Sequence, residues 1–147
     1  MSVLDKFSDI SSGHWAKYAL AFVVSNGYMK GYPDGTFKPD AYISRAELAQ
    51  VLYSLNMAKT GGTPKTFSDV SGHWAIDAIN AMSASGVITG YPDGTFRPDN
   101  PVTRAETVTM FSRLLGRADT WTGNKSFSDV PQTHWAYKYI MNAVNGQ

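Results

Sequence analysis

Apolar residues recur three and four positions apart in five segments of the chain, the spacing of helices with one buried face. Three of these segments begin near a His-Trp-Ala motif and end at a glycine that can close a helix in the left-handed conformation. The motifs start at His14, His73 and His134, and the glycines are Gly27, Gly86 and Gly146. The predicted stripes are Trp15, Ala16, Ala19, Leu20 and Val23; Trp74, Ala75, Ala78, Ile79 and Met82; and Trp135, Ala136, Tyr139, Ile140 and Ala143. We therefore predict three short first helices.

The other two segments carry a clear helix start. Ser44 and Glu47 stand three residues apart, as do Thr103 and Glu106. This spacing predicts a capping box, in which the hydroxyl accepts from the glutamate's backbone N–H and the glutamate accepts from the cap residue's N–H. The predicted buried positions that follow are Leu48, Val51, Leu52 and Leu55, and then Met110, Phe111 and Leu114. Thr107 takes the place of Leu48 in the second copy, which weakens that stripe.

Turn residues separate the two kinds of helix. Proline at 33 and 92 fixes one backbone dihedral, and the Asp-Gly pair after it tolerates positive φ. Residues 59–65 are rich in Gly, Thr and Pro, and residues 116–126 are polar apart from Trp121. We expect both stretches to be solvent-facing linkers.

The motifs form an internal repeat with a period of 60 residues at Phe7, Phe67 and Phe127. Phe-Ser-Asp-(Ile/Val) and His-Trp-Ala occur three times, whereas Gly-Tyr-Pro-Asp-Gly-Thr-Phe and (Ser/Thr)-Arg-Ala-Glu occur twice. We predict repeat 1 over residues 1–59, repeat 2 over 60–119, and a partial repeat 3 over 120–147 that holds a first helix only.

These four motifs, in this order and at this spacing, resemble the S-layer homology repeat of bacterial cell-surface proteins. The resemblance implies three repeats around a pseudo-threefold axis, with the first helices in a central bundle. It also implies that grooves between repeats hold secondary cell wall polymer, often through a pyruvylated sugar, and that the motif arginine contributes to that contact. We therefore expect an all-α fold of helix-loop-helix repeats around a central three-helix bundle, with the third repeat incomplete.

Composition and charge narrow the function classes. Hydrophobic residues make up 43% and charged residues 17%, which suits a globular protein. The net charge of +1 and the lack of a Lys or Arg run argue against nucleic-acid binding. The chain has no cysteine, which excludes disulfides, thiolate metal sites and cysteine nucleophiles. Its longest apolar run, residues 19–24, is too short to span a bilayer. No signal peptide opens the chain, so export to the cell surface would depend on a signal outside it.

Arg45 and Arg104 each occupy the first position of a predicted helix. The helix N-terminus is electropositive, and a guanidinium beside it suits a carboxylate such as that of a ketal-linked pyruvate. Loop glycines allow a sugar to approach the backbone, and Trp or Tyr faces can stack on its ring. We expect two grooves, centred on Arg45 and Arg104. The full set of candidate glycan contacts is Arg45, Arg104, Gly31, Tyr32, Asp34, Gly90, Tyr91, Asp93, Trp15, Trp74 and Trp135.

Structural roles compete with these binding roles. Core packing is the favoured role for the three tryptophans, because each lies on an apolar stripe. The three histidines are expected to act at helix starts, and Glu47 and Glu106 as capping residues. A surface ion pair is an equal alternative for the arginines. The equivalent aspartates Asp9, Asp69 and Asp129 are expected to bond backbone in their entry turns.

Taken together, the sequence predicts non-covalent anchoring of a surface protein through an acidic cell-wall polysaccharide, with no cofactor, no metal, no nucleic acid and no membrane insertion. The alternatives are an enzyme, a calcium-dependent module, and a protein–protein or self-assembly module that associates through the incomplete third repeat. Glycoside hydrolysis needs one asymmetric carboxylate pair, whereas every repeated carboxylate here has a turn or capping role. Asp34-Gly35 lacks the alternating donors of a calcium loop. We expect Arg104→Ala to weaken glycan binding with little effect on the fold.

Overall fold

The computed structural model describes residues 2–55, 61–117 and 120–146. The helices within these ranges are α1 (Lys17–Ser25), α2 (Arg45–Ser54), α3 (Ile76–Ala84), α4 (Arg104–Leu114) and α5 (Tyr137–Asn145). No strand occurs in the described ranges, where a bridge pairs Ser44 with Pro101. The predicted all-α fold is confirmed. The predicted repeat boundaries at residues 59–60 and 119 lie outside the described residues.

The first helices α1, α3 and α5 start one residue after each His-Trp-Ala motif. Their N-cap residues are alanines without a capping side chain. The histidine ring supplies the acceptor instead, since Nδ1 of His73 accepts from the backbone N–H of Ala75 at 3.1 Å. His14 and His134 do the same in their repeats, so the predicted structural role of the histidines is confirmed.

Glycine closes two of these three helices as predicted. Gly27 and Gly86 have φ angles of 71° and 73°, the left-handed conformation that favours glycine after a last helical turn. Gly146 is different, because its φ is −76° and its backbone is extended. The prediction of a left-handed cap is therefore wrong in repeat 3.

The second helices begin where the capping boxes predict. Glu47 N–H donates to the Ser44 hydroxyl at 3.1 Å, and Ser44 N–H donates to the Glu47 carboxylate at 2.7 Å. Thr103 and Glu106 repeat the same pair of bonds at the start of α4. Four backbone donors are satisfied in this way. The first residue of each of these two helices is the motif arginine, Arg45 in α2 and Arg104 in α4.

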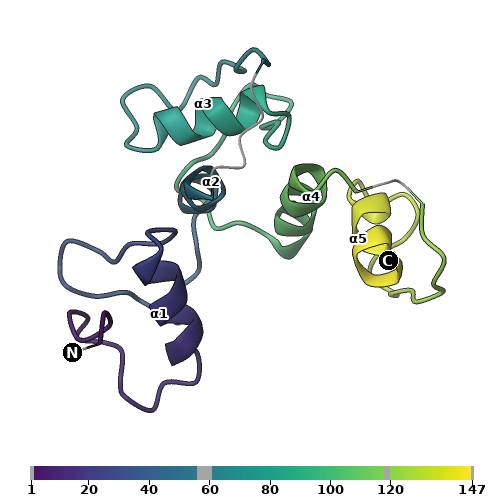
Figure 1. Ribbon diagram of the computed structural model, residues 1–147. Coiled ribbons are helices and arrows are strands. Elements are labelled where there is room, and N and C mark those ends of the chain that lie inside the picture. Colours follow the sequence, from purple (N-terminus) through teal and green to yellow (C-terminus); the bar gives the residue numbers. More distant parts are fainter. Residues whose placement is uncertain (1, 56–60, 118–119, 147) are drawn as a thin grey trace.

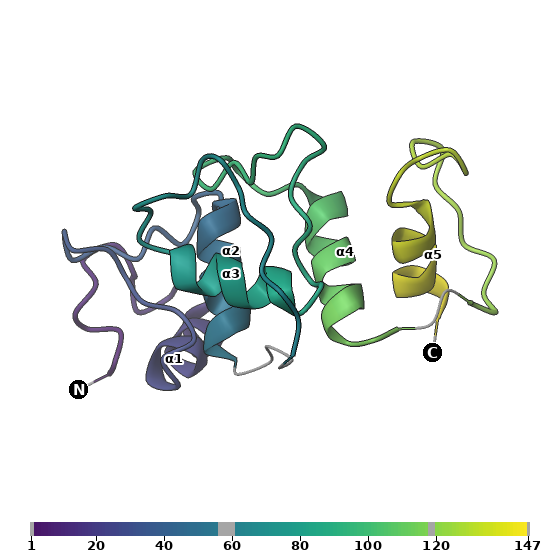
Figure 2. The same ribbon diagram turned by 90° about the horizontal axis from the view of Figure 1, so that it is seen from above.

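Helix packing is offset from the sequence repeat by half a repeat. The second helix of repeat 1, α2, packs on α3 of repeat 2, and α4 of repeat 2 packs on α5 of repeat 3. Figure 1 shows α2 between α1 and α3, and Figure 1 and Figure 2 both show α4 between α3 and α5. Within the described residues α1, α3 and α5 do not pack on one another. The predicted central bundle of first helices is therefore not seen, and the pseudo-threefold arrangement stays a prediction.

Two buried clusters follow this offset. The larger joins α2 to repeat 2 and contains Ala46, Leu48, Ala49, Leu52, Phe67, Val70, Ala75, Ile79, Met82, Val87, Ile88, Phe96, Met110 and Leu114. The smaller lies within repeat 1 and contains Leu4, Phe7, Leu20, Val24 and Phe37. The first four buried residues of the larger cluster come from repeat 1, so the main core crosses the boundary between sequence repeats.

The three tryptophans are not core residues. Trp15, Trp74 and Trp135 are 87%, 62% and 59% exposed. Each lies in the turn before its helix, so the buried stripe begins one residue later, at Ala75 in repeat 2. The expectation of core packing is therefore wrong, and these indole rings are free to meet a ligand.

Parts of the other predicted stripes are also exposed. Phe111 is 38% exposed, and Ala19 and Ala143 lie at the surface. The buried face of α5 is partly polar, since Asn142 and Asn145 are buried beside Met141. Asn142 donates to Thr120 O, and Asn145 exchanges two hydrogen bonds with the Lys125 backbone. Hydrogen bonding to the preceding linker, rather than apolar burial alone, sets the rotation of this helix.

Candidate functional site

The Gly-Tyr-Pro-Asp-Gly-Thr-Phe loop of repeat 2 is held by two aspartates. Asp93 accepts from the Thr95 backbone at 3.0 Å and the Thr95 hydroxyl at 2.6 Å. Asp69 accepts from the backbone N–H of Phe96 at 2.8 Å and of Arg97 at 2.7 Å. These bonds support Arg97 at a φ of 59°, a conformation unusual for a residue with a side chain.

The role of Asp69 corrects a prediction. It bonds backbone, but at the far end of the loop rather than in its own entry turn. Asp9 does the same in repeat 1, where it accepts from Phe37 and Lys38. The backbone N–H of Phe37 is the chief reason that the pKa of Asp9 is lowered, with burial opposing it. Asp129 has no such partner loop in the described part of the chain.

Gly90 makes the loop pack closely on the Phe-Ser-Asp motif. A Cβ placed at Gly90, whose φ is 67°, would lie 2.3 Å from Cε1 of Phe67. Gly31 meets Phe7 in the same way in repeat 1. The first loop glycine is therefore required by packing within the repeat, in addition to any role at a ligand.

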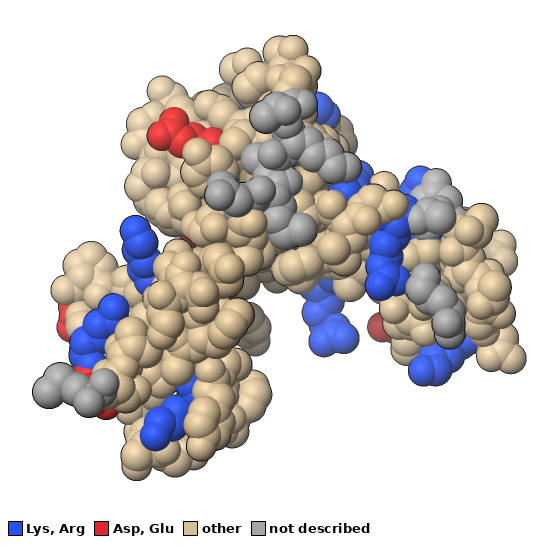
Figure 3. Space-filling view, in the orientation of Figure 1, with Lys and Arg blue, Asp and Glu red and all other residues tan. Residues whose placement is uncertain are grey.

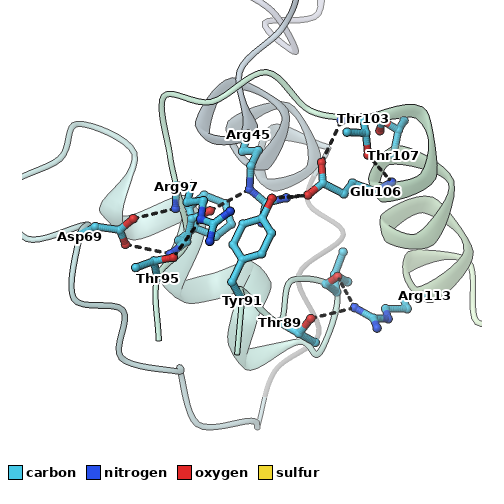
Figure 4. A network of polar contacts seen from close by, with 12 residues as sticks. Arg45, Asp69, Thr89, Tyr91, Thr95, Arg97, Thr103, Glu106, Thr107 and Arg113 are labelled. Carbon is cyan, nitrogen blue, oxygen red and sulfur yellow. Dashed lines mark hydrogen bonds and ion pairs between the residues drawn. The ribbon is translucent and has the colours of Figure 1, made fainter. Parts of the chain in front are cut away.

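Arg45 joins the two repeats at the centre of the site. Its side chain is 4% exposed, Nε donates to Phe96 O at 2.7 Å, and Nη1 donates to Glu106 Oε1 at 2.6 Å. Its guanidinium also lies 4.7 Å from the ring centroids of both Tyr91 and Phe96. Figure 4 shows Arg45, Tyr91 and Glu106 converging. Because Glu106 balances its charge, the main role of Arg45 is structural: it ties α2 of repeat 1 to the loop and α4 of repeat 2.

The carboxylate of Glu106 is held as an anion. Tyr91 also donates its hydroxyl to Glu106 Oε1, and Thr103 donates its backbone N–H to Oε2. Burial raises the pKa of Glu106, but the Thr103 and Tyr91 hydrogen bonds and the Arg45 charge outweigh it, so its pKa is lowered. Burial and the Glu106 hydrogen bond raise the pKa of Tyr91, which keeps the phenol a donor.

The equivalent site in repeat 1 has no arginine. Tyr32 donates to Glu47 Oε1 at 2.6 Å, and this bond, with burial, raises the pKa of Tyr32 to about 12. Lys38 lies 4.1 Å above the Tyr32 ring and 3.8 Å from the Asp34 carboxylate. The tyrosine–glutamate pair is thus common to both repeats, whereas the buried cation belongs to one.

A groove of about 580 Å³ opens beside Arg45. One wall is the loop segment from Thr89 to Pro92, the second is α4, and Trp135 of repeat 3 closes it. From α4 come Glu106, Thr109 and Arg113, whose spacing places them on one helix face.

The groove brings together part of the predicted set of contacts. Arg45, Gly90, Tyr91 and Trp135 line it. Gly31, Tyr32, Asp34, Asp93, Arg104, Trp15 and Trp74 do not. Arg104 is exposed and forms no ion pair within the described residues. Their glycan contacts stay predictions.

Three groove residues were missed by sequence reasoning. Thr89, Thr109 and Arg113 all line the groove. The signal for two of them was available, because a face that contains Glu106 continues through positions three and seven residues later. No repeated motif includes them, so attention to repeated residues passed over them.

Basic side chains are dispersed over the face of the molecule drawn in Figure 3. Figure 3 shows Lys and Arg standing apart from one another on this face, without one continuous patch. Among the described residues there is no group of three or more metal-ligating side chains. No helix in those ranges is long and apolar enough to cross a membrane.

The sequence matches the model of a known protein family. A model of the S-layer homology domain matches residues 6–49 and 66–108. The chain belongs to the S-layer homology family. The two matches contain both Gly-Tyr-Pro-Asp loops and both motif arginines, and thus the residues that join repeat 1 to repeat 2.

Several cell-surface proteins are similar to this S-layer homology chain. Cell surface glycoprotein 1 of Acetivibrio thermocellus is 42% identical over 94% of the chain and 6% of its own length. A cellulosome-anchoring protein of the same organism is 43% identical over 94% of the chain and 32% of its own. S-layer protein EA1 of Bacillus anthracis is 30% identical over 95% of the chain and 16% of its own length. The chain thus spans at most about a third of these relatives.

Proposed function

We propose that this S-layer homology chain is a non-catalytic module that anchors a surface protein to the bacterial cell wall by binding an acidic secondary cell wall polymer. The observation that carries the proposal is the groove between the repeat 2 loop, α4 and Trp135. Relatives named for cellulosome anchoring and for S-layers support the same role.

The groove has the chemistry of a sugar site. Trp135 is 59% exposed at its edge, and an indole face stacks on the apolar side of a sugar ring. The polar wall carries hydroxyls and a guanidinium from Thr89, Thr109 and Arg113. Small-ligand sites combine an apolar platform with a few placed polar groups in this manner.

The finer proposal is that the polymer carries a pyruvylated amino sugar. A ketal-linked pyruvate adds one carboxylate to an otherwise neutral ring, and arginine binds carboxylates with bidentate geometry. Arg104, Trp74 and the repeat 1 residues Gly31, Tyr32 and Asp34 remain proposed glycan contacts outside this groove. Two sites on one chain would raise the apparent affinity for a polymer that repeats the same unit.

The proposal is tested with isolated cell-wall sacculi. One portion retains its secondary polymer, and the other is stripped of it by acid. We expect the chain to sediment with the first and to remain in solution with the second. Equal sedimentation with both would assign binding to peptidoglycan, and no sedimentation with either would refute the anchoring role.

Self-association is the second candidate function, and an exposed apolar face formed by α1 and the turn before it favours it. Trp15 and Tyr18 are each 87% exposed and Phe22 is 61% exposed. The corresponding helices α3 and α5 each pack on a second helix, whereas α1 packs on none within the described residues. A second copy of this chain would cover the α1 face. Light scattering at about 100 µM protein tests this, because a dimer with a micromolar dissociation constant would be mostly formed at that concentration. A monomer mass would exclude self-association.

A further inference from the structure

We propose that Arg113, with Thr89, is the carboxylate-recognition pair of the groove, and that Arg45 and Arg104 are not. This inference rests on the proposed glycan function and names the atoms that read the acidic group. It assigns recognition to a residue that lies outside the repeated arginine motif.

Charge balance separates the three arginines. Arg45 is buried and shares a hydrogen-bonded ion pair with Glu106 at 2.6 Å. Its Nε is also used, by Phe96 O. A second carboxylate at Arg45 would have to displace Glu106, which also holds Tyr91 and caps α4. Arg104 is exposed and does not line the groove.

Arg113 lines the groove and forms no ion pair within the described residues. Its Nη1 donates to Thr89 Oγ1 at 3.3 Å and to Val87 O at 3.5 Å, and its Nε donates to the Tyr139 hydroxyl at 3.3 Å. All three acceptors are neutral and all three bonds are long. The guanidinium is therefore positioned from three sides while its charge is uncompensated.

Thr89 completes the pair. Its hydroxyl oxygen accepts from Arg113, which leaves its own proton available to a ligand. Figure 4 shows Arg113 reaching from α4 toward Thr89, on the other side of Tyr91 from Arg45. A carboxylate bound there would accept from the guanidinium and from the Thr89 hydroxyl, while Trp135 faces the sugar ring at the groove edge.

The neighbouring repeat does not offer this pair. Ser54 stands at the position of Arg113, and its hydroxyl donates to Gln50 O at 2.8 Å. Gln50 Nε2 donates back to it at 3.3 Å. The Ser54 hydroxyl is thus bonded to the backbone and the side chain of Gln50, and neither residue carries a charge. Carboxylate recognition through an α-helical arginine therefore belongs to repeat 2.

The experiment is calorimetric titration with two probes of equal shape. One is the methyl glycoside of an N-acetyl amino sugar that carries a pyruvate ketal, and the other carries the carboxamide of that ketal. We expect the intact chain to bind the carboxylate probe more tightly. We expect Arg113→Gln to lose at least about tenfold in affinity for it, the size of one charge-assisted hydrogen bond, with less than about a twofold change for the carboxamide.

The matched control is Arg117→Gln. Arg117 is an exposed arginine that does not line the groove, so its loss should change neither affinity by more than about twofold. Arg113→Lys should recover part of the preference for the carboxylate. Thermal melting of each variant verifies folding.

Three results would overturn the inference. They are full carboxylate preference in Arg113→Gln, equal loss for both probes in that folded variant, and no carboxylate preference in the intact chain. None of them removes the anchoring role, because sedimentation with polymer-bearing sacculi tests that role separately.

Discussion

At the residue scale, two arginines that occupy the same motif position have different surroundings. Arg45 is 3% exposed and is held by Phe96 O and Glu106. Arg104 is exposed. The difference arises because the loop that receives Arg45 belongs to the next repeat, and the described part of repeat 3 has no such loop. A motif position therefore fixes the start of a helix, but not the environment of its side chain.

Substitution should separate the two arginines by stability. Arg45→Ala leaves Glu106 partly buried without its cation, and losing one partner of a buried pair costs about 3–5 kcal/mol. Arg104→Ala removes an exposed side chain and should change stability by less than about 0.5 kcal/mol. Urea unfolding of both variants measures this. Equal losses would mean that Arg104 has a partner equivalent to Glu106.

A second residue-scale prediction follows from the tryptophans. Trp74 is 62% exposed, whereas Ile79 is fully buried in the main core. We expect Trp74→Ala to lower the free energy of unfolding by less than about 1 kcal/mol. Ile79→Ala should lower it by about 2–5 kcal/mol, because it leaves a cavity in a packed core. Chemical denaturation of the pair checks the assignment, and a larger loss in Trp74→Ala would contradict it.

At the element scale, local signals were the most readable. The starts of α2 and α4 followed from Ser44-Glu47 and Thr103-Glu106, because a capping box is made by residues three apart. The glycine ends at Gly27 and Gly86 were equally local. By contrast, the bond from Asp69 to the Arg97 backbone spans 28 residues, and the helix face at Arg113 meets the groove only after α4 has packed beside α5. Local spacing carries no information on such contacts.

The aspartates that hold the repeat 2 loop determine how low pH affects the stability of the fold. Hydrogen bonds from the Thr95 side chain and backbone, and the Arg97 charge, lower the pKa of Asp93 from 3.8 to about 2. In Asp69 burial opposes the bonds from Phe96 and Arg97, but its pKa is also lowered. A lowered folded-state pKa gives stability that is complete above the unfolded pKa and lost as pH falls through the folded pKa.

We therefore expect the urea midpoint to stay level from pH 7 to about 5 and to fall steadily between about 4 and 2. Asp93→Asn should show a shallower fall over that window, since it no longer loses a charge. Both the urea midpoint and the far-ultraviolet circular dichroism are measured at each pH. A midpoint that is unchanged or higher at pH 2.5 would contradict the assignment of these carboxylates.

At the scale of the whole molecule, the packing unit and the sequence repeat are out of register. α2 is encoded by repeat 1 but contributes Ala46, Leu48, Ala49 and Leu52 to the core of repeat 2. Backbone bonds reinforce this, since Arg45 N–H donates to Asn100 O at 2.9 Å and Ala46 N–H donates to Pro98 O at 2.9 Å. Sequence identity between copies cannot reveal this offset, because every second helix has the same pattern whichever first helix it covers.

Two truncations test which unit folds. A fragment of residues 41–147 keeps α2 with repeat 2, whereas a fragment of residues 61–147 begins one residue after the predicted start of repeat 2 and lacks α2. The second fragment exposes the face of α3 that contains Ile79 and Met82, both fully buried in the intact chain. Removing α2 takes two leucines and two alanines out of this core. Each buried leucine alone is worth about 2–5 kcal/mol, so the loss is a large share of the roughly 5–15 kcal/mol by which domains are stable.

We accordingly expect residues 41–147 to retain helical circular dichroism and a cooperative urea transition, and residues 61–147 to lose both. α1 does not pack on another helix within the described residues, so its removal should leave the main core intact. Cooperative unfolding of both fragments with similar midpoints would show that each sequence repeat is its own folding unit. Loss of structure in both would instead show that the repeat 1 cluster around Phe7 and Leu20 supports the rest of the chain.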